Sequence, residues 1–252
     1  MKRNKIDKVI YCVDQAAKRC AGVEIDWNSF TDIIRAVIID RNADEGYWTA
    51  LKYGVNNDWY VQIYKNISIG SNETILDIGC GYGNLWRQSW NNIPSCVKVT
   101  LMGLHGTWAD NFVKFVYENS HSLKERTSFE FVWEDVENNG SITRKFDRII
   151  ANYLFMFIKE PLKLMHRIKD AITENGLFYC INGGNTVALE TIAALLKGFV
   201  STLDNIIEKI SQIKSKNQEF KNQLDAVFDG VEWITLESGW AFKNASEFFN
   251  IL

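Results

Sequence analysis

The sequence of 252 residues contains little proline and no long apolar run. Its two prolines, Pro94 and Pro161, come without any low-complexity linker, so nothing indicates separable domains. No apolar run approaches the roughly 18–20 residues that a membrane helix needs, and the N-terminus lacks the uninterrupted apolar core of a signal peptide. We therefore expect a cytoplasmic protein that has no membrane partner.

Patterns that bind metals or nucleic acids are also missing. The five cysteines contain no C-x-x-C pair and show no zinc-like spacing with the three histidines, which predicts reduced thiols and no metal site. Lysine and arginine are scattered and the net charge is −3, whereas a nucleic-acid binder usually carries a basic patch. RNA or DNA is therefore disfavoured as a substrate.

Aromatic residues are abundant by contrast, with nine Trp, nine Tyr and fifteen Phe, and they indicate an aromatic-rich interior or pocket. The chain falls into three parts by pattern. Residues 1–70 are helical and aromatic, 71–182 alternate apolar runs with amphipathic stretches, and 183–252 are mostly helical before one or two strand-like runs. We predict a main domain at 71–252 with an N-terminal helical cap or lid at 1–70 and a helical insertion at 183–230 that caps the substrate.

The middle part predicts a parallel sheet with crossover helices. Five short apolar runs predict buried strands, at Thr74–Ile78, Lys98–Gly103, Phe129–Trp133, Phe146–Ala151 and Leu177–Ile181. The stretches between them predict helices near Asn84–Trp90, Thr107–Asn119 and Glu160–Ile172, and Glu174-Asn175-Gly176 predicts a turn. This alternation predicts a doubly wound α/β sheet with its ligand site at the carboxyl ends of the strands.

A glycine loop, Asp77-Ile-Gly79-Cys-Gly81-Tyr-Gly83, follows the first strand and opens a helix. Glycine lets the backbone turn sharply and approach a ligand closely, because no Cβ stands in the way. A dinucleotide loop of the form G-x-G-x-x-G would need glycine at position 84, which is Asn84, and no lysine of a nucleotide-phosphate loop follows. The pattern therefore favours a different ligand, with a tight turn that binds nothing as the alternative.

Three stretches resemble class I S-adenosylmethionine-dependent methyltransferases, specifically the bacterial small-molecule type: LDIGCGYGNLW at 76–86, FEFVWEDV at 129–136, and residues 146–183. The resemblance covers roughly residues 45–250. It implies a Rossmann-like seven-stranded sheet with helices on both faces, an N-terminal cap and a helical insertion after the fifth strand. It also implies S-adenosyl-L-methionine as the cofactor.

The resemblance assigns roles to individual residues. Asp77, with the backbone at Gly79, Cys80 and Gly81, would hold the amino-acid end of the cofactor. The other assigned positions are Asp135, within Glu134-Asp135-Val136, for the adenine amino group; Asn152, beside the methyl group; and Tyr53, closing over the cofactor. A cap or turn acid is the alternative for the two aspartates, and simple packing is the alternative for Asn152 and Tyr53.

The sequence departs from this family where the second strand ends. Relatives carry an acid there that grips both ribose hydroxyls, but this chain has Gly103, Leu104 and His105. Losing a bidentate charged contact costs roughly 1.5–3 kcal/mol of binding unless another group replaces it. His105 could donate a hydrogen bond to one ribose hydroxyl. The alternative is that it is a surface or packing histidine without a role in binding.

A second departure concerns proton transfer. Tyr153 and Phe157 stand where relatives often carry histidine, so no general base is evident. An amine, a thiolate or an acidic phenol needs little help from a base, whereas a poorly acidic hydroxyl needs one. The sequence therefore favours a nitrogen, sulfur or acidic oxygen nucleophile, with Tyr53 and Tyr153 as the candidates for proton handling.

Two helical regions carry open alternatives. The aromatic residues of 47–64 predict either a lid over the active site or the core of a helical layer. Residues 189–227 show a heptad-like pattern that Asn217 interrupts, which predicts two helices of a substrate cap or, as the alternative, the seam of a homodimer. The leading hypothesis is methyl transfer to a small molecule in specialised metabolism. The alternative is a non-catalytic or non-methylating protein of the same fold that binds a partner or ligand.

Overall fold

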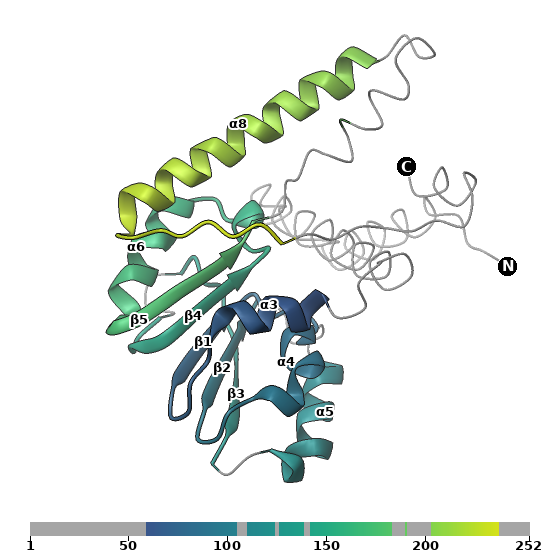
Figure 1. Ribbon diagram of the computed structural model, residues 1–252, viewed down its shortest axis with the longest axis vertical. Helices are drawn as coiled ribbons and strands as arrows, with labels where there is room; N and C mark the ends of the chain where they lie inside the picture. The colour runs from purple at the N-terminus through teal and green to yellow at the C-terminus, as the bar shows by residue number, and fades with distance from the viewer. Residues whose placement is uncertain are drawn as a thin grey trace, which may run out of the picture. The chain divides into compact units, whose positions relative to one another are not determined.

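Five parallel strands form one sheet in the order β3-β2-β1-β4-β5 (Figure 1). The computed structural model describes residues 59–104, 110–123, 126–138, 142–182, 190 and 203–236. These belong to a compact unit that spans Asp58–Ser238. The predictions for Tyr53 and His105 lie outside the described residues, as does most of the predicted 1–70 cap.

The strands follow the apolar runs of the sequence closely. Their bounds are Thr74–Ile78 for β1, Lys98–Gly103 for β2, Ser128–Trp133 for β3, Phe146–Asn152 for β4 and Ile172–Ile181 for β5. The α/β parallel sheet is confirmed, and β1 and β2 have the predicted bounds. Within the part of the chain that the structure describes, five of the seven expected strands are present, and residues 231–236 form no strand.

Strand β5 begins earlier than predicted, so it includes the predicted turn at Glu174-Asn175-Gly176. The β4–β5 register changes from Phe146↔Ile172 to Arg148↔Leu177, so β4 advances two residues while β5 advances five. The extra residues form a bulge in which a Cβ on Gly176 would lie 2.6 Å from Cγ2 of Ile172. Glu174-Asn175-Gly176 therefore does bend the chain, but inside a strand, because pairing with β4 resumes directly afterwards.

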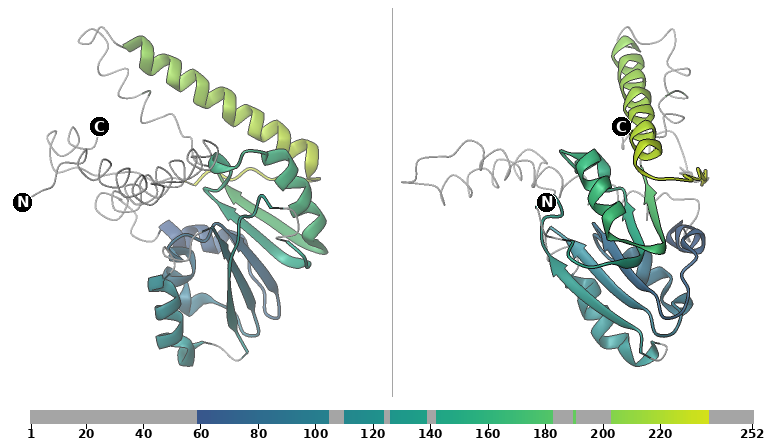
Figure 2. Two further views of the ribbon diagram at one scale, coloured as in Figure 1. Left: turned by 180° about the vertical axis from the view of Figure 1, so that it is seen from behind. Right: turned by 90° about the vertical axis from the view of Figure 1, so that its left-hand side faces the viewer.

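The helices lie on both faces of the sheet (Figure 2). Their bounds are Trp59–Ile67 for α3, Asn84–Gln88 for α4, Asp110–Asn119 for α5, Pro161–Ala171 for α6 and Leu203–Val227 for α8. The helix predicted over 84–90 is shorter, because the chain leaves the α conformation at Ser89 and makes a 3₁₀ turn, Trp90–Asn92. Short 3₁₀ turns also occur at Ser120–Ser122 and Phe155–Phe157.

Each face has its own apolar core, because successive strand residues point to opposite sides. The face covered by α3, α4 and α5 includes Ile75 and centres on Trp86, whose ring is edge-on to Tyr64 and Phe129. The face covered by α6 and α8 includes Leu76. Burying both faces explains why the central strands are continuous apolar runs in the sequence.

Helix α8 is one uninterrupted helix of 25 residues that runs through Asn217. Asn217 therefore interrupts the apolar pattern without ending the helix, because a single asparagine costs a helix only a few tenths of a kcal/mol more than average residues. The two helices expected within 189–227 stay a prediction, since residues 191–202 lie outside the described part of the chain. Its C-terminal end packs on the sheet through Phe220, Leu224 and Val227, and Nζ of Lys169 on α6 donates to the Val227 carbonyl at 2.6 Å. The homodimer seam along α8 stays a prediction.

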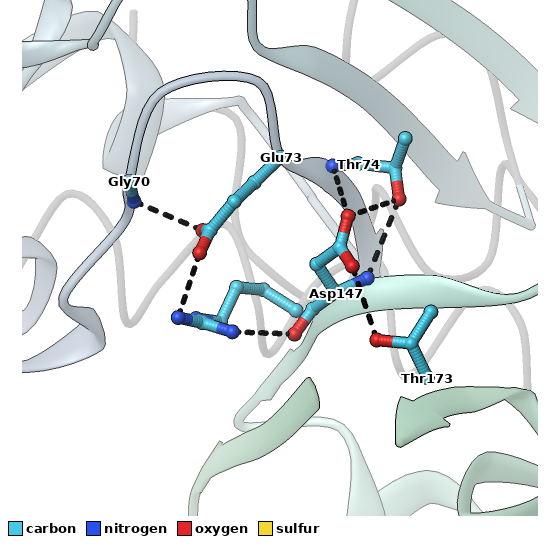
Figure 3. Close-up of polar contacts among 6 residues, drawn as sticks. Gly70, Glu73, Thr74, Asp147 and Thr173 are labelled. Atoms are coloured by element: carbon cyan, nitrogen blue, oxygen red, sulfur yellow. Dashed lines mark hydrogen bonds and ion pairs between the residues drawn. The ribbon is translucent and has the colours of Figure 1, made fainter. Parts of the chain in front are cut away.

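Polar side chains join the amino ends of β1, β4 and β5 (Figure 3). Oδ2 of Asp147 accepts hydrogen bonds from the backbone N–H and Oγ1 of Thr74, both at 2.8 Å, and Oδ1 accepts from Oγ1 of Thr173 at 3.0 Å. Nearby, Nη2 of Arg148 pairs with Oε1 of Glu73 at 2.7 Å. These contacts fix the register of three strands at the end opposite the glycine loop.

We expect the Asp147→Asn variant to be less stable at pH 7 by about 1–2 kcal/mol, because charge-assisted hydrogen bonds become neutral ones. Burial raises the pKa of Asp147, but hydrogen bonds from Thr74 and Thr173 outweigh it and hold that pKa below its usual value. This stabilisation is complete above pH ~4 and is lost as pH falls through the lowered folded-state pKa.

Urea unfolding at pH 7 and near pH 3 checks this prediction. The difference between wild type and Asp147→Asn should shrink in acid, and Asp225→Asn, a change at an exposed position of α8, serves as the control. A pH-independent difference would contradict the proposed origin in charge.

Candidate cofactor site

The sheet has one point where the strand order reverses. From β1 the order continues to β2 and β3 on one side and to β4 and β5 on the other, so the connections leave the β1–β4 pair in opposite directions. Open α/β sheets bind ligands in the crevice at the carboxyl ends beside such a point. The residues that end or follow the strands at this edge are Gly79, Gly103, Trp133 and Asn152.

The glycine loop begins at this edge and bends over β2. The backbone N–H groups of Gly79 and Cys80 both donate to the Met102 carbonyl, at 2.8 and 3.3 Å. At Gly83 (φ +68°) a Cβ would lie 2.3 Å from the Phe112 ring, so this glycine is required by the packing of α5. At Gly81 (φ +51°) a Cβ would meet nothing within 4 Å. The loop is therefore open to a ligand at Gly81.

Asp77 lies inside the protein, directly before this loop. Its side chain is only 3% exposed, and Oδ2 accepts a hydrogen bond from Nε1 of Trp86 at 2.7 Å. Burial raises the pKa of Asp77 to about 7, although the hydrogen bond from Trp86 acts in the opposite direction. The helix-cap alternative is wrong for this residue, because Gly83 occupies the N-cap of α4 and no side chain caps it.

The thiol of Cys80 lies half-buried in the loop. Burial and the nearby carboxyl of Asp77 raise the pKa of this thiol, so it stays protonated at neutral pH. A protonated thiol is a weak nucleophile. A catalytic role as a nucleophile is therefore not expected of the Cys80 side chain, while the contact of its backbone with the cofactor stays a prediction.

The residues after β3 are divided between core and surface. Val136 is buried and belongs to the core, while Glu134 is exposed and donates its N–H to the Gly103 carbonyl at 2.9 Å. Their predicted contact with the cofactor stays a prediction. Asp135 accepts the N–H of Glu137 on Oδ1 at 2.9 Å, which is the turn role considered for it. Its second carboxylate oxygen remains a candidate contact for the adenine amino group.

Asn152 ends β4 at the same edge of the sheet, and Tyr153 comes directly after it. Asn152 pairs with Ile181 of β5 and is half-buried. Tyr153 has a left-handed backbone (φ +57°), and its hydroxyl accepts a hydrogen bond from Nε1 of Trp59 at 3.1 Å. Burial raises the pKa of Tyr153, so its phenol keeps its proton at neutral pH. In that form it cannot act as a base that removes a proton from another group.

Two tryptophans at this edge were not assigned individual roles from the sequence. Trp59, at the start of α3, reaches Tyr153 across 94 residues of sequence, and no local pattern could predict that contact. Trp133 ends β3 with 41% of its surface exposed. A detectable signal existed for Trp133, because a large aromatic side chain at the predicted ligand edge of a strand is unusual on packing grounds. Further along α3, Tyr64 is buried in the core, so the packing alternative holds there.

The fold and these residues match a known family. The model of the methyltransferase domain family matches residues 58–225, which is 168 of the 252 residues. The chain belongs to this family, and its domain is a class I S-adenosylmethionine-dependent methyltransferase domain. S-adenosylmethionine is therefore its cofactor, and the open glycine loop beside an acid fits the polar amino-acid end of that molecule.

Individual relatives are distant. A candidate methyltransferase, 235L, of Invertebrate iridescent virus 6 is 24% identical over 139 residues, which cover 53% of this chain and 48% of the relative. The chain thus matches about half the length of that protein. The plantazolicin methyltransferase BamL has a TM-score of 0.49 at 16% identity, covering 74% of this chain and 67% of BamL. A candidate methyltransferase of Methanococcus maripaludis has a TM-score of 0.47 at 20% identity, covering 72% of this chain and 80% of that chain.

Two features are reported for the described residues alone. None of their helices is long and apolar enough to cross a membrane. They also contain no group of three or more His, Cys, Asp or Glu side chains arranged to hold a metal ion.

We expect Gly83→Ala and Gly81→Ala to separate folding from binding. Both glycines have a positive φ, which costs a residue with a Cβ about 1–2 kcal/mol. At Gly83 the overlap with Phe112 adds to this cost, so Gly83→Ala should lower the melting temperature much more than Gly81→Ala. At Gly81 the methyl group points into the open loop, so that variant should stay folded and bind S-adenosylhomocysteine more weakly.

Thermal melting and isothermal titration of both variants check this pair. Equal loss of stability in the two variants would contradict the packing role of Gly83, and unchanged binding by Gly81→Ala would contradict the open approach at Gly81.

Proposed function

We propose that this protein transfers the methyl group of S-adenosylmethionine to a nitrogen, sulfur or acidic oxygen atom of a small molecule, in specialised metabolism. The observation that carries the proposal is the glycine loop at the reversal point of the sheet, with the buried Asp77 directly before it and open space at Gly81. Membership of the methyltransferase domain family supports the reaction class.

Asp77 and the loop backbone would bind the amino-acid end of the cofactor. In its ionised form the Asp77 carboxylate attracts the ammonium group, and the backbone at Gly79 and Gly81 lets that end approach closely. Asn152 would lie beside the reacting centre from the end of β4. When bound, S-adenosylmethionine would supply a methyl group on a positively charged sulfur, whose carbon the acceptor attacks in line while the carbon–sulfur bond breaks and S-adenosylhomocysteine leaves.

The protonation state of Tyr153 supports the choice of acceptor. A phenol that keeps its proton cannot remove one from the acceptor, although it can orient an acceptor by donating a hydrogen bond. Alignment of nucleophile and methyl group can supply much of the rate without a base. Amines, thiolates and acidic phenols meet this condition, and the net charge of −3 disfavours a nucleic-acid acceptor.

Titration of the full chain with S-adenosylmethionine and S-adenosylhomocysteine tests the first step. We expect saturable binding with a dissociation constant well below one millimolar, since the ionised Asp77 and the open loop backbone offer charge-assisted contacts to the amino-acid end of the cofactor. Absence of heat or chemical-shift changes at millimolar cofactor would overturn the proposal. Incubation with amines, thiols and phenols, followed by detection of methylated product, tests the second step.

The Asp77→Asn variant tests the polar end of the site through pH. The folded-state pKa of about 7 lies above the ordinary value of about 3.9, so the folded protein holds a proton that the unfolded chain has released. Stability therefore falls as pH rises from about 4 to 7. The neutral variant lacks this penalty and should be more stable than wild type at pH 8 by about 1–3 kcal/mol, with a smaller difference at pH 5.

The same variant should lose the pH dependence of cofactor binding. Wild type should bind S-adenosylhomocysteine more tightly at pH 8 than at pH 5.5, because Asp77 must ionise to attract the ammonium group, whereas Asp77→Asn should bind more weakly at pH 8 and with little pH dependence. Titrations and thermal melts at both pH values measure these effects. Parallel pH profiles in the two proteins would show that Asp77 does not contact the charged end of the cofactor.

A second candidate function is a non-catalytic or non-methylating protein of the same fold. Two observations favour it, namely Gly103 in the place of a ribose-binding acid and the lack of histidine at Tyr153 and Phe157. Tight binding of S-adenosylhomocysteine without turnover of any amine, thiol or phenol would support this function. Methylation of one acceptor with multiple turnovers would exclude it.

A further inference from the structure

An aromatic ring borders Gly103 where the carboxyl ends of β2 and β3 lie side by side. Gly103 pairs with Trp133 across the two strands. A Cβ on Gly103 would lie 3.4 Å from Cζ3 and 3.6 Å from Cε3 of Trp133, and 3.8 Å from Sγ of Cys80 in the glycine loop. The indole ring therefore borders both the end of β2 and the loop.

Trp133 is held in place but keeps a free surface. Phe131 lies on the same face of β3, and the two rings stack with centroids 5.9 Å apart and an interplanar angle of 30°. Trp133 nevertheless exposes 41% of its surface, and Leu104, directly after Gly103, exposes 51%. An exposed indole face that borders the predicted ligand crevice is available for contact with an apolar ligand face.

We propose that Trp133 is the stacking surface for the nucleoside end of the cofactor, which is held by ring packing at the β2–β3 edge instead of by a carboxylate at position 103. This inference rests on the proposed binding of S-adenosylmethionine. An aromatic ring can stack on the face of a base without any charge, and such a contact typically contributes ~1–3 kcal/mol. That range matches the roughly 1.5–3 kcal/mol that a bidentate carboxylate would contribute.

The site therefore has two ends of opposite character. Asp77 and the open backbone at Gly81 form the polar end, whereas Trp133 forms the apolar end. A substitution at one end should therefore weaken cofactor binding at that end and leave the contacts at the other end unchanged. A ligand that carries only the nucleoside should therefore depend on Trp133 as strongly as the whole cofactor does.

Titration with two ligands tests the assignment. S-adenosylhomocysteine carries both ends, whereas 5′-methylthioadenosine carries the nucleoside without the amino acid. We expect Trp133→Ala to raise the dissociation constants of both ligands by the same factor, roughly tenfold to a hundredfold. Trp133→Phe should retain most of the affinity, because it keeps an aromatic face.

Trp233→Ala is the matched control. Trp233 is a tryptophan of similar exposure, 49%, whose ring contacts Lys221 of α8 instead of the β2–β3 edge. This variant should bind both ligands as wild type does. Thermal melting of all variants separates binding from stability, and loss of affinity in Trp133→Ala at an unchanged melting temperature supports the assignment.

Four outcomes would overturn it. Wild-type affinity of Trp133→Ala for both ligands, or a loss confined to S-adenosylhomocysteine, would show that the ring does not stack on the nucleoside while the proposed function stands. A destabilised Trp133→Ala combined with a Trp133→Phe that binds no better would indicate a structural role. Failure of wild type to bind S-adenosylhomocysteine would instead overturn the proposed function, and this inference with it.

Discussion

The hydrogen bond between Trp86 and Asp77 joins the core of this protein to its cofactor loop. Trp86 is fully buried, with its ring edge-on to Tyr64 of α3 and Phe129 of β3, and its Nε1 reaches the carboxyl at 2.7 Å. One side chain thus connects α3, α4, β1 and β3 at the base of the glycine loop. The loop position depends on this contact, since α4 could not turn away without leaving a buried acid unpaired.

The same contact explains the electrostatic character of the site. A carboxyl that is almost completely buried and bonded to a neutral indole favours its protonated form, which is why the pKa of Asp77 rises to about 7. Ionising this buried carboxyl costs free energy in the protein without ligand, and a positively charged ligand group lowers that cost. Perturbed acids of this kind are concentrated at functional sites, whereas Asp147 at the opposite end of the sheet has the lowered pKa of a structural hydrogen-bonded acid.

The sequence predicted the sheet well and its irregularities poorly. Strands β1 and β2 have the predicted bounds because both faces are buried, and that burial leaves uninterrupted apolar runs. The bulge in β5 was predicted as a turn, because Glu174-Asn175-Gly176 has turn chemistry whether or not a neighbouring strand resumes pairing afterwards. Asn217 interrupts the apolar pattern of α8 but not the helix itself, because a helix with buried residues beyond that position tolerates one weak helix former.

The sequence by itself determined the glycine loop, the acid before it, the alternation of strands and helices and the lack of a carboxylate at Gly103. These are local patterns, or the lack of one, and local sequence contains them completely. Tertiary structure alone decided that Asp77 is buried against Trp86, that Trp59 bonds Tyr153 across 94 residues, and that Trp133 borders Gly103. Those contacts depend on which strands become neighbours and how helices pack on them, and no single stretch of chain specifies either.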